Sequence, residues 1–94
     1  MILPGSPRAG DYFLLESDEV SIGRNPDADV FVDDRSVSRE HVRLVREEDG
    51  GYRVEDLGSR NGTFVNRRRI DSQRLEDGDE IQIGVYAFGY LERA

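Results

Sequence analysis

Short apolar stretches recur about every ten residues along this chain, and strong turn-forming residues separate them. Several stretches alternate with period two, as Val42 and Leu44 do around Arg43, which is the pattern of a half-buried strand. No window contains an amphipathic helical stripe of useful length. The stretches are Tyr12–Leu15, Val20–Ile22, Val30–Val32, Val42–Val45, Tyr52–Leu57, Phe64–Val65, Ile81–Val85 and Tyr86–Leu91. Many short strands with such turns predict an all-β fold, a two-sheet β-sandwich or a barrel.

Turn chemistry predicts two hairpins. Asp49-Gly50-Gly51 should join Val42–Arg46 to Tyr52–Asp56, because glycine supplies the positive φ that tight hairpin turns need. Near the end of the chain, Ile81–Gly84 and Tyr86–Leu91 either pair with each other or form one strand with a bulge at its glycine.

Length and composition indicate one domain. Met1 to Gly10 contains two prolines and two glycines and is expected to be a flexible leader ahead of a domain over residues 11–94. The longest apolar run, Tyr12–Leu15, is too short to span a bilayer, and the leader lacks the features of a secretory signal. The chain has no cysteine, which excludes a disulfide framework and a thiolate metal site. We therefore expect a cytoplasmic protein.

The charge balance restricts the class of ligand. A net charge of −7 argues against nucleic-acid binding, because duplex affinity comes largely from basic residues that neutralise phosphates. All 13 basic residues are arginine. Codon bias in a GC-rich genome is enough to account for this, but arginine also offers a planar fork that grips phosphate bidentately. An acidic chain with local arginines can therefore still bind a single phosphate group.

Three segments concentrate polar residues between the predicted strands. They are Gly23–Asp29, Ser36–His41 and Gly58–Thr63. A β-sandwich gathers its loops at two ends, so these segments can form one site. That site would offer the guanidinium groups of Arg24, Arg39 and Arg60, the hydroxyl of Ser38 and the amide of Asn61. This set is short of general bases and rich in donors to an anion, as a static phosphate receptor should be.

The order of motifs on these segments is more specific than any one of them. Gly23-Arg24, Ser38-Arg39-Glu40-His41 and Asn61–Asn66 together resemble the forkhead-associated domain family, most closely its small actinomycete members. The resemblance covers roughly residues 11 to 91. It implies a β-sandwich of eleven strands whose apical loops bind phosphothreonine peptides, in a family that reads phosphorylated motifs with arginine clusters.

The resemblance also implies a role for each residue of the site. Arg24 and Ser38 would hold the phosphate, and Arg39 would flank it. Asn61 would bind the peptide backbone on either side of the phosphothreonine, with Arg60 beside it. Structural support would come from Gly23, His41, Gly62 and Asn66. Asn61-Gly62 is also a strong hairpin-turn signal, and a rigid turn is compatible with recognition.

A hydrolase is one alternative function. His41 is the only histidine and follows Ser38 by three residues, and Asp56 would complete a triad. A triad needs a hydrogen bond between nucleophile and base and also an oxyanion site. In this motif the histidine is instead expected to turn inward and brace its loop. We therefore expect no enzymatic activity and no cofactor.

Two clusters of charged residues suggest binding sites, but the pattern of each favours an ordinary surface feature. The acidic set Asp27, Asp29, Asp33 and Asp34 suggests calcium, but it lacks the regular spacing, central glycine and closing glutamate of a calcium loop. We expect it to be a solvated rim that holds no metal. Arg67-Arg68-Arg69, followed by Ile70, favours a polar turn over a basic patch.

The expected partner is a phosphothreonine-containing protein, a Ser/Thr kinase or its substrate. We expect a monomer without nucleic-acid binding or membrane insertion. Thr63 is the only threonine in the sequence and is expected on the binding surface. Because it cannot reach back into the site formed by its own loop, it cannot serve as an internal ligand, which predicts binding in trans. The alternative within the same fold is a phospho-independent scaffold that uses a sheet face for assembly.

Overall fold

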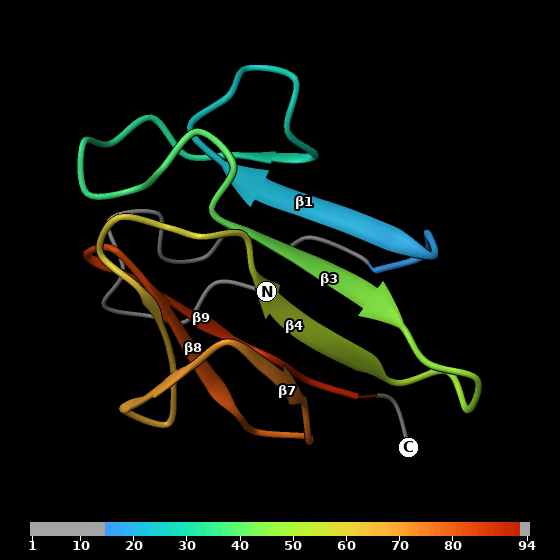
Figure 1. Ribbon diagram of the computed structural model, residues 1–94. Coiled ribbons are helices and arrows are strands. Elements are labelled where there is room, and N and C mark those ends of the chain that lie inside the picture. Colours follow the sequence, from blue (N-terminus) through green and yellow to red (C-terminus); the bar gives the residue numbers. More distant parts are fainter. Residues whose placement is uncertain (1–14, 93–94) are drawn as a thin grey trace.

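The computed structural model describes residues 15–92, which form nine strands and no helix. These strands make two sheets, of order β2-β1-β3-β4-β7 and β6-β5-β8-β9, that pack face to face (Figure 1). The strands are β1 (Glu19–Gly23), β2 (Val30–Phe31), β3 (Val42–Arg46), β4 (Tyr52–Asp56), β5 (Thr63–Val65), β6 (Arg68–Ile70), β7 (Ser72–Arg74), β8 (Glu80–Ile83) and β9 (Tyr86–Gly89). The all-β sandwich prediction is confirmed. The described residues form nine strands, against the eleven that the family resemblance implies for the domain. The expected leader and most of Tyr12–Leu15 lie outside the described residues.

The core lies between the two sheets and follows the predicted alternation. In β3 the side chains of Val42 and Leu44 are buried, and in β8 those of Ile81 and Ile83 are buried. Each fully buried aliphatic side chain contributes about 1.5–3 kcal/mol to folding. No helix in the described part of the chain is long and apolar enough to cross a membrane.

Both predicted hairpins form. β3 pairs with β4 in antiparallel register, from Val42 opposite Asp56 to Arg46 opposite Tyr52. β8 and β9 are separate paired strands, not one bent strand, and Gly84 takes a φ of 61° in the turn between them. Local turn chemistry therefore predicts these pairings correctly.

Two turn predictions are wrong. Asn61-Gly62 is not a hairpin turn, because β4 and β5 belong to different sheets and residues 57–62 cross between them. Arg67-Arg68-Arg69 is not simply a turn either. Asn66 and Arg67 form the turn, with φ of 50° and 71°, and Arg68–Ile70 is a strand paired with β5. An exposed three-residue strand has too little apolar alternation to be predicted.

Candidate functional site

The first two polar segments lie side by side at the end of β1. The amide of Arg24 donates to the carbonyl of Ser38 at 2.9 Å, and the amide of Asn25 donates to the carbonyl of Arg39 at 3.1 Å. A Cβ added at Gly23 would lie 2.1 Å from the carbonyl oxygen of Arg39, so only glycine permits this approach. The backbone therefore holds Arg24 and Ser38 next to each other.

The third segment is tied to the second through Ser38 and His41. The Ser38 hydroxyl oxygen accepts the amide of Arg60 at 3.0 Å. The fully buried His41 ring accepts the Ser38 amide at its Nδ1, at 3.0 Å, and its Nε2 lies 2.9 Å from the carbonyl oxygen of Gly62. The three polar segments therefore meet at one end of the sandwich, as the sequence predicts.

These contacts fix the protonation of His41. A backbone amide can only donate and a carbonyl can only accept, so the ring is neutral with its proton on Nε2. Burial lowers the pKa of His41, although the hydrogen bond to Gly62 and the charge of Asp56 oppose the shift. Both ring nitrogens are engaged by the backbone, so neither accepts a proton from the Ser38 hydroxyl. The geometry is that of a brace and not of a catalytic pair.

Asn61 is oriented by Ser36, a residue that no sequence motif singles out. Its side-chain Nδ2 donates to the carbonyl of Ser36 at 2.9 Å. The Ser36 hydroxyl donates to Asp34 Oδ1 at 2.6 Å and accepts the amide of Val85 at 3.1 Å. Hydrogen bonds from Ser36 lower the pKa of Asp34. A Cβ at Gly84 would lie 2.7 Å from the Ser36 carbonyl oxygen. Ser36 thus joins the second segment to the β8–β9 turn and holds Asn61 in place.

Asp56 is the second residue whose structural role the sequence did not predict. Its Oδ1 accepts the hydroxyls of Ser59 and Thr63, the latter at 2.7 Å, and its Oδ2 accepts the amides of Gly58 and Ser59 at 3.1 Å. Burial raises the pKa of Asp56, but these hydrogen bonds outweigh that effect and the net pKa is lowered. The ionised carboxylate therefore organises the third segment.

The prediction that Thr63 lies on the binding surface is wrong. Its side chain is fully buried at the start of β5, and its hydroxyl donates a hydrogen bond to the partly buried carboxylate of Asp56. A signal for Asp56 was present in the sequence, since a carboxylate that closes a strand before Gly-Ser is a common local acceptor for loop amides.

The arginines of residues 15–92 fall into two groups. One group, on β3, β4 and β7 of the five-stranded sheet, forms ion pairs with carboxylates: Arg43, Arg46, Arg53 and Arg74. The other group forms none with any described residue: Arg24, Arg35, Arg39, Arg60, Arg67, Arg68 and Arg69. All members of this second group are exposed. Two of the residues predicted to bind phosphate, Arg24 and Arg39, therefore carry a positive charge that no carboxylate of residues 15–92 neutralises, in a protein of net charge −7.

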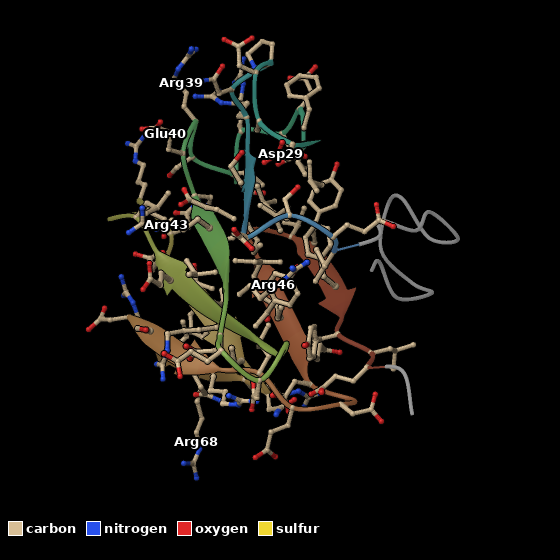
Figure 2. All side chains as sticks on the ribbon, turned by 90° about the vertical axis from the view of Figure 1, so that its right-hand side faces the viewer. Asp29, Arg39, Glu40, Arg43, Arg46 and Arg68 are labelled. Carbon is tan, nitrogen blue, oxygen red and sulfur yellow. The ribbon has the colours of Figure 1, made fainter. Side chains whose placement is uncertain are left out.

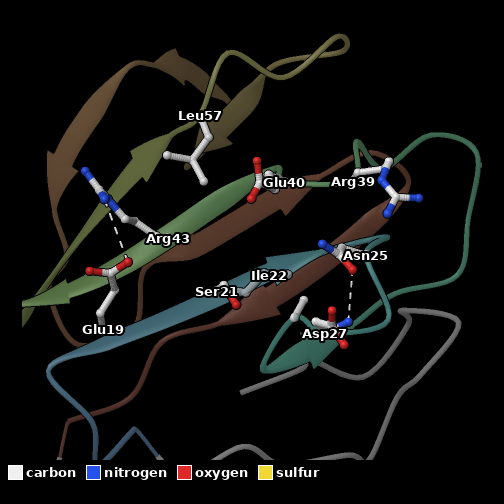
Figure 3. Close-up of a pocket in the computed structure, with 10 residues that line it drawn as sticks. Glu19, Ser21, Ile22, Asn25, Asp27, Arg39, Glu40, Arg43 and Leu57 are labelled. Atoms are coloured by element: carbon white, nitrogen blue, oxygen red, sulfur yellow. Dashed lines mark hydrogen bonds and ion pairs between the residues drawn. The ribbon is translucent and has the colours of Figure 1, made fainter.

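A hollow of about 570 Å³ adjoins the loops on the outer face of the five-stranded sheet (Figure 3). Asn25 and Arg39 line it where the loops begin, and an ion pair between Glu19 and Arg43, at 3.7 Å, lines it farther along the sheet. A ligand held at Arg39 has room to extend into this hollow.

The remaining predicted residues have structural positions. Gly62 has a φ of 86°, which favours glycine. Asn66 lies in the turn at the other end of β5, where its side chain accepts the Glu80 amide at 3.0 Å and donates to Asp79 at 2.9 Å. It therefore braces the sheet away from the loops. No cluster of three or more His, Cys, Asp or Glu side chains among residues 15–92 is arranged to hold a metal ion.

Sequence comparisons identify relatives over nearly the whole chain. A family model described as FHA domain matches residues 20–84. The glycogen accumulation regulator GarA of Mycolicibacterium smegmatis is 46% identical over 91 residues, which are 97% of this chain and 57% of that protein. The oxoglutarate dehydrogenase inhibitor of Corynebacterium diphtheriae is 42% identical over 92 residues, which are 98% of this chain and 64% of that protein. This chain thus spans less than two thirds of the length of these relatives.

Solved structures show the same architecture. A structure from a study of phosphothreonine-dependent FHA domain interactions superposes with a TM-score of 0.86 at 30% identity, and covers 94% of this chain and 91% of that one. Mycobacterium tuberculosis EmbR in complex with a low-affinity phosphopeptide gives a TM-score of 0.77 at 36% identity, over 82% of this chain and 20% of that one.

Proposed function

This chain belongs to the FHA domain family, and on that premise we propose that it is a phosphothreonine-binding interaction module and not an enzyme. Arg24 and Ser38 hold the phosphate, and Arg39 flanks it. Asn61 binds the peptide backbone, with Arg60 beside it. One observation carries the proposal: the hydrogen-bonded junction of three loops sets Arg24, which has no ion pair among residues 15–92, next to Ser38.

The chemistry of this junction suits a phosphate dianion. A guanidinium offers a planar fork of donors, and the Ser38 hydroxyl can still donate its hydrogen while its oxygen accepts the Arg60 amide. The side-chain oxygen of Asn61 forms no hydrogen bond within the described residues, so it can accept a backbone amide of the peptide. The buried network beneath holds these groups in place before binding, which lowers the entropic cost of association.

The names of the relatives suggest the kind of partner. One relative is named as a regulator of glycogen accumulation and another as an inhibitor of oxoglutarate dehydrogenase, and one structural neighbour is in complex with a phosphopeptide. We propose that this chain acts in the cytoplasm as a monomer, and binds in trans a phosphothreonine of a Ser/Thr kinase or its substrate. The alternative is a phospho-independent scaffold, which would bind an unphosphorylated partner through a sheet face.

Substitution of Arg24 tests the proposal. Charge-assisted hydrogen bonds contribute roughly 1.5–3 kcal/mol, so Arg24→Ala should weaken phosphothreonine peptide binding by about 10- to 150-fold in calorimetric titrations. Arg24→Lys should also lose affinity, because an ammonium cannot reproduce the fork. The matched control is Arg68→Ala, which removes another exposed arginine that has no ion pair in the described part of the chain and lies at the opposite end of the molecule to Arg39 (Figure 2). Equal affinities of Arg24→Ala and the parent would remove Arg24 from the phosphate site.

Matched peptides test the nature of the ligand. Burial of one methyl group is worth about 0.8 kcal/mol, or roughly fourfold, so a fitted pocket should prefer phosphothreonine to phosphoserine by at least that factor. Glutamate mimics should fail, because a carboxylate has less charge and fewer acceptor oxygens than a phosphate dianion. An unphosphorylated partner that binds as tightly as its phosphorylated form would favour the scaffold alternative.

A further inference from the structure

Asn61 and Gly62 form the only Asn-Gly pair of the sequence. Such a pair is chemically labile, because the backbone nitrogen of the glycine can attack the side-chain carbonyl carbon of the asparagine, and glycine has no side chain to hinder the approach. A nitrogen–carbon bond forms, the bond to Nδ2 breaks, and ammonia leaves with the proton of the glycine amide. Water then opens the resulting ring to aspartate or isoaspartate. The asparagine of the candidate site is therefore prone to deamidation.

The fold holds both reacting groups of this pair. Nδ2 of Asn61 donates to the carbonyl oxygen of Ser36 at 2.9 Å, which fixes the amide that would have to leave. The amide of Gly62 donates to the Ser59 hydroxyl at 3.0 Å, and its carbonyl oxygen lies 2.9 Å from His41 Nε2. The attacking nitrogen is therefore hydrogen-bonded, and the peptide groups on either side of the Gly62 Cα cannot rotate without breaking these contacts.

The surroundings of the Gly62 amide also oppose the loss of its proton, which the attack requires. Gly62 is buried although Asn61 is exposed, and the Arg69 guanidinium covers it, since a Cβ added at Gly62 would lie 2.9 Å from Arg69 Nε. The Ser59 hydroxyl donates its own hydrogen to the carboxylate of Asp56, so its oxygen remains an acceptor for the Gly62 amide. A base from solvent therefore reaches this amide only when the loop opens.

We propose that Asn61 is a deamidation site that the folded loop network protects, and that the hydrogen bond from Gly62 to Ser59 provides most of the protection. The chemistry is independent of the proposed function, whereas its consequence for binding rests on that function. A carboxylate at position 61 could not donate to the Ser36 carbonyl, and it would add negative charge beside a bound phosphate. Local opening of the loop would therefore lead to irreversible loss of the binding site.

The test follows the conversion of Asn61 in mildly alkaline buffer by peptide mapping and mass spectrometry, in the folded protein and in a synthetic peptide of residues 57–66. Conversion in the folded protein should be slower by about tenfold or more, because two hydrogen bonds of the buried Gly62 must open first. Ser59→Ala should remove most of this protection. The matched control is Ser72→Ala, which changes an exposed serine of β7 and should leave the protection intact.

Asn66 reports global unfolding in the same samples, because its side chain is held by Asp79 and Glu80 at the other end of β5. Its conversion should be the same in Ser59→Ala and the parent. If Ser59→Ala accelerates the conversion of both asparagines, the variant has unfolded, and the folded parent against the peptide then decides the proposal. Equal rates in the folded parent and the peptide, or in folded Ser59→Ala and Ser72→Ala, would refute it.

Calorimetric titration with a phosphothreonine peptide tests the consequence for binding. Asn61→Asp, which reproduces one product of deamidation, should bind more weakly than the parent by about tenfold or more. Unchanged affinity of Asn61→Asp would overturn the predicted loss of the site. If the parent itself binds no phosphothreonine peptide, the proposed function fails, and the conversion rates still decide whether the fold protects Asn61.

Discussion

Replacement of His41 by alanine should destabilise the domain more than any exposed change at the site. The substitution leaves the Ser38 amide and the Gly62 carbonyl without partners, at about 1–3 kcal/mol each when buried. It also removes a ring that is fully buried, and large-to-small changes in a core add a cavity cost. These contributions are not additive, so we expect a total of about 3–5 kcal/mol, against about 5–15 kcal/mol for a typical domain.

Chemical denaturation measures this loss directly, as a lower midpoint with an unchanged slope. Glu40→Ala is the matched control, because Glu40 is adjacent and exposed and its side chain has no hydrogen bond or ion pair in the described residues. Phosphopeptide affinity of His41→Ala should fall as well, since Ser38 loses its support. A variant as stable as the parent but unable to bind would refute the brace and indicate direct contact between His41 and the ligand.

Two further predictions concern the loop network. Gly23→Ala should cost about 3 kcal/mol or more, because its Cβ would overlap the backbone carbonyl of Arg39. Gly50→Ala lies in an open turn and should cost only about 1–2 kcal/mol, from its positive φ alone, so similar thermal unfolding of the two variants would contradict this prediction. Because the pKa of Asp56 is lowered on folding, its carboxylate stabilises the folded state above the unfolded pKa of about 3.9, and this contribution is lost as the pH falls through the lower pKa of the folded state. Asp56→Asn should therefore make the free energy of unfolding less dependent on pH below about pH 4. If the pH dependence in this range is the same in the variant and the parent, Asp56 does not have this role.

The fold class and the location of the site follow from the sequence because they depend on local patterns. Alternation of apolar residues predicts which face of a strand is buried, as in Val42 and Leu44. Glycine turns predict the β3–β4 hairpin. Segments of polar residues between strands predict loops, and a sandwich brings loops to its ends.

Only the tertiary structure decided how the loops are joined. Asn61-Gly62 has the local signature of a hairpin turn, yet the chain crosses there to the other sheet, because β5 pairs with β6 and β8 and not with β4. Thr63 looks like a surface residue beside a turn and is instead buried against Asp56. Ser36 carries no motif, and its importance arises from contacts with residues far along the chain.

The arginines show the same division. The sequence determines that every basic residue is an arginine and that the chain is acidic overall. It does not determine which guanidiniums are neutralised, because ion pairs such as Arg74 with Asp49 join residues that only strand pairing brings together. Likewise, the contact of Arg69 with Gly62 depends on the β5–β6 register. Composition is a property of the chain, whereas the partner of each charge is set by long-range contacts that the folded backbone alone creates.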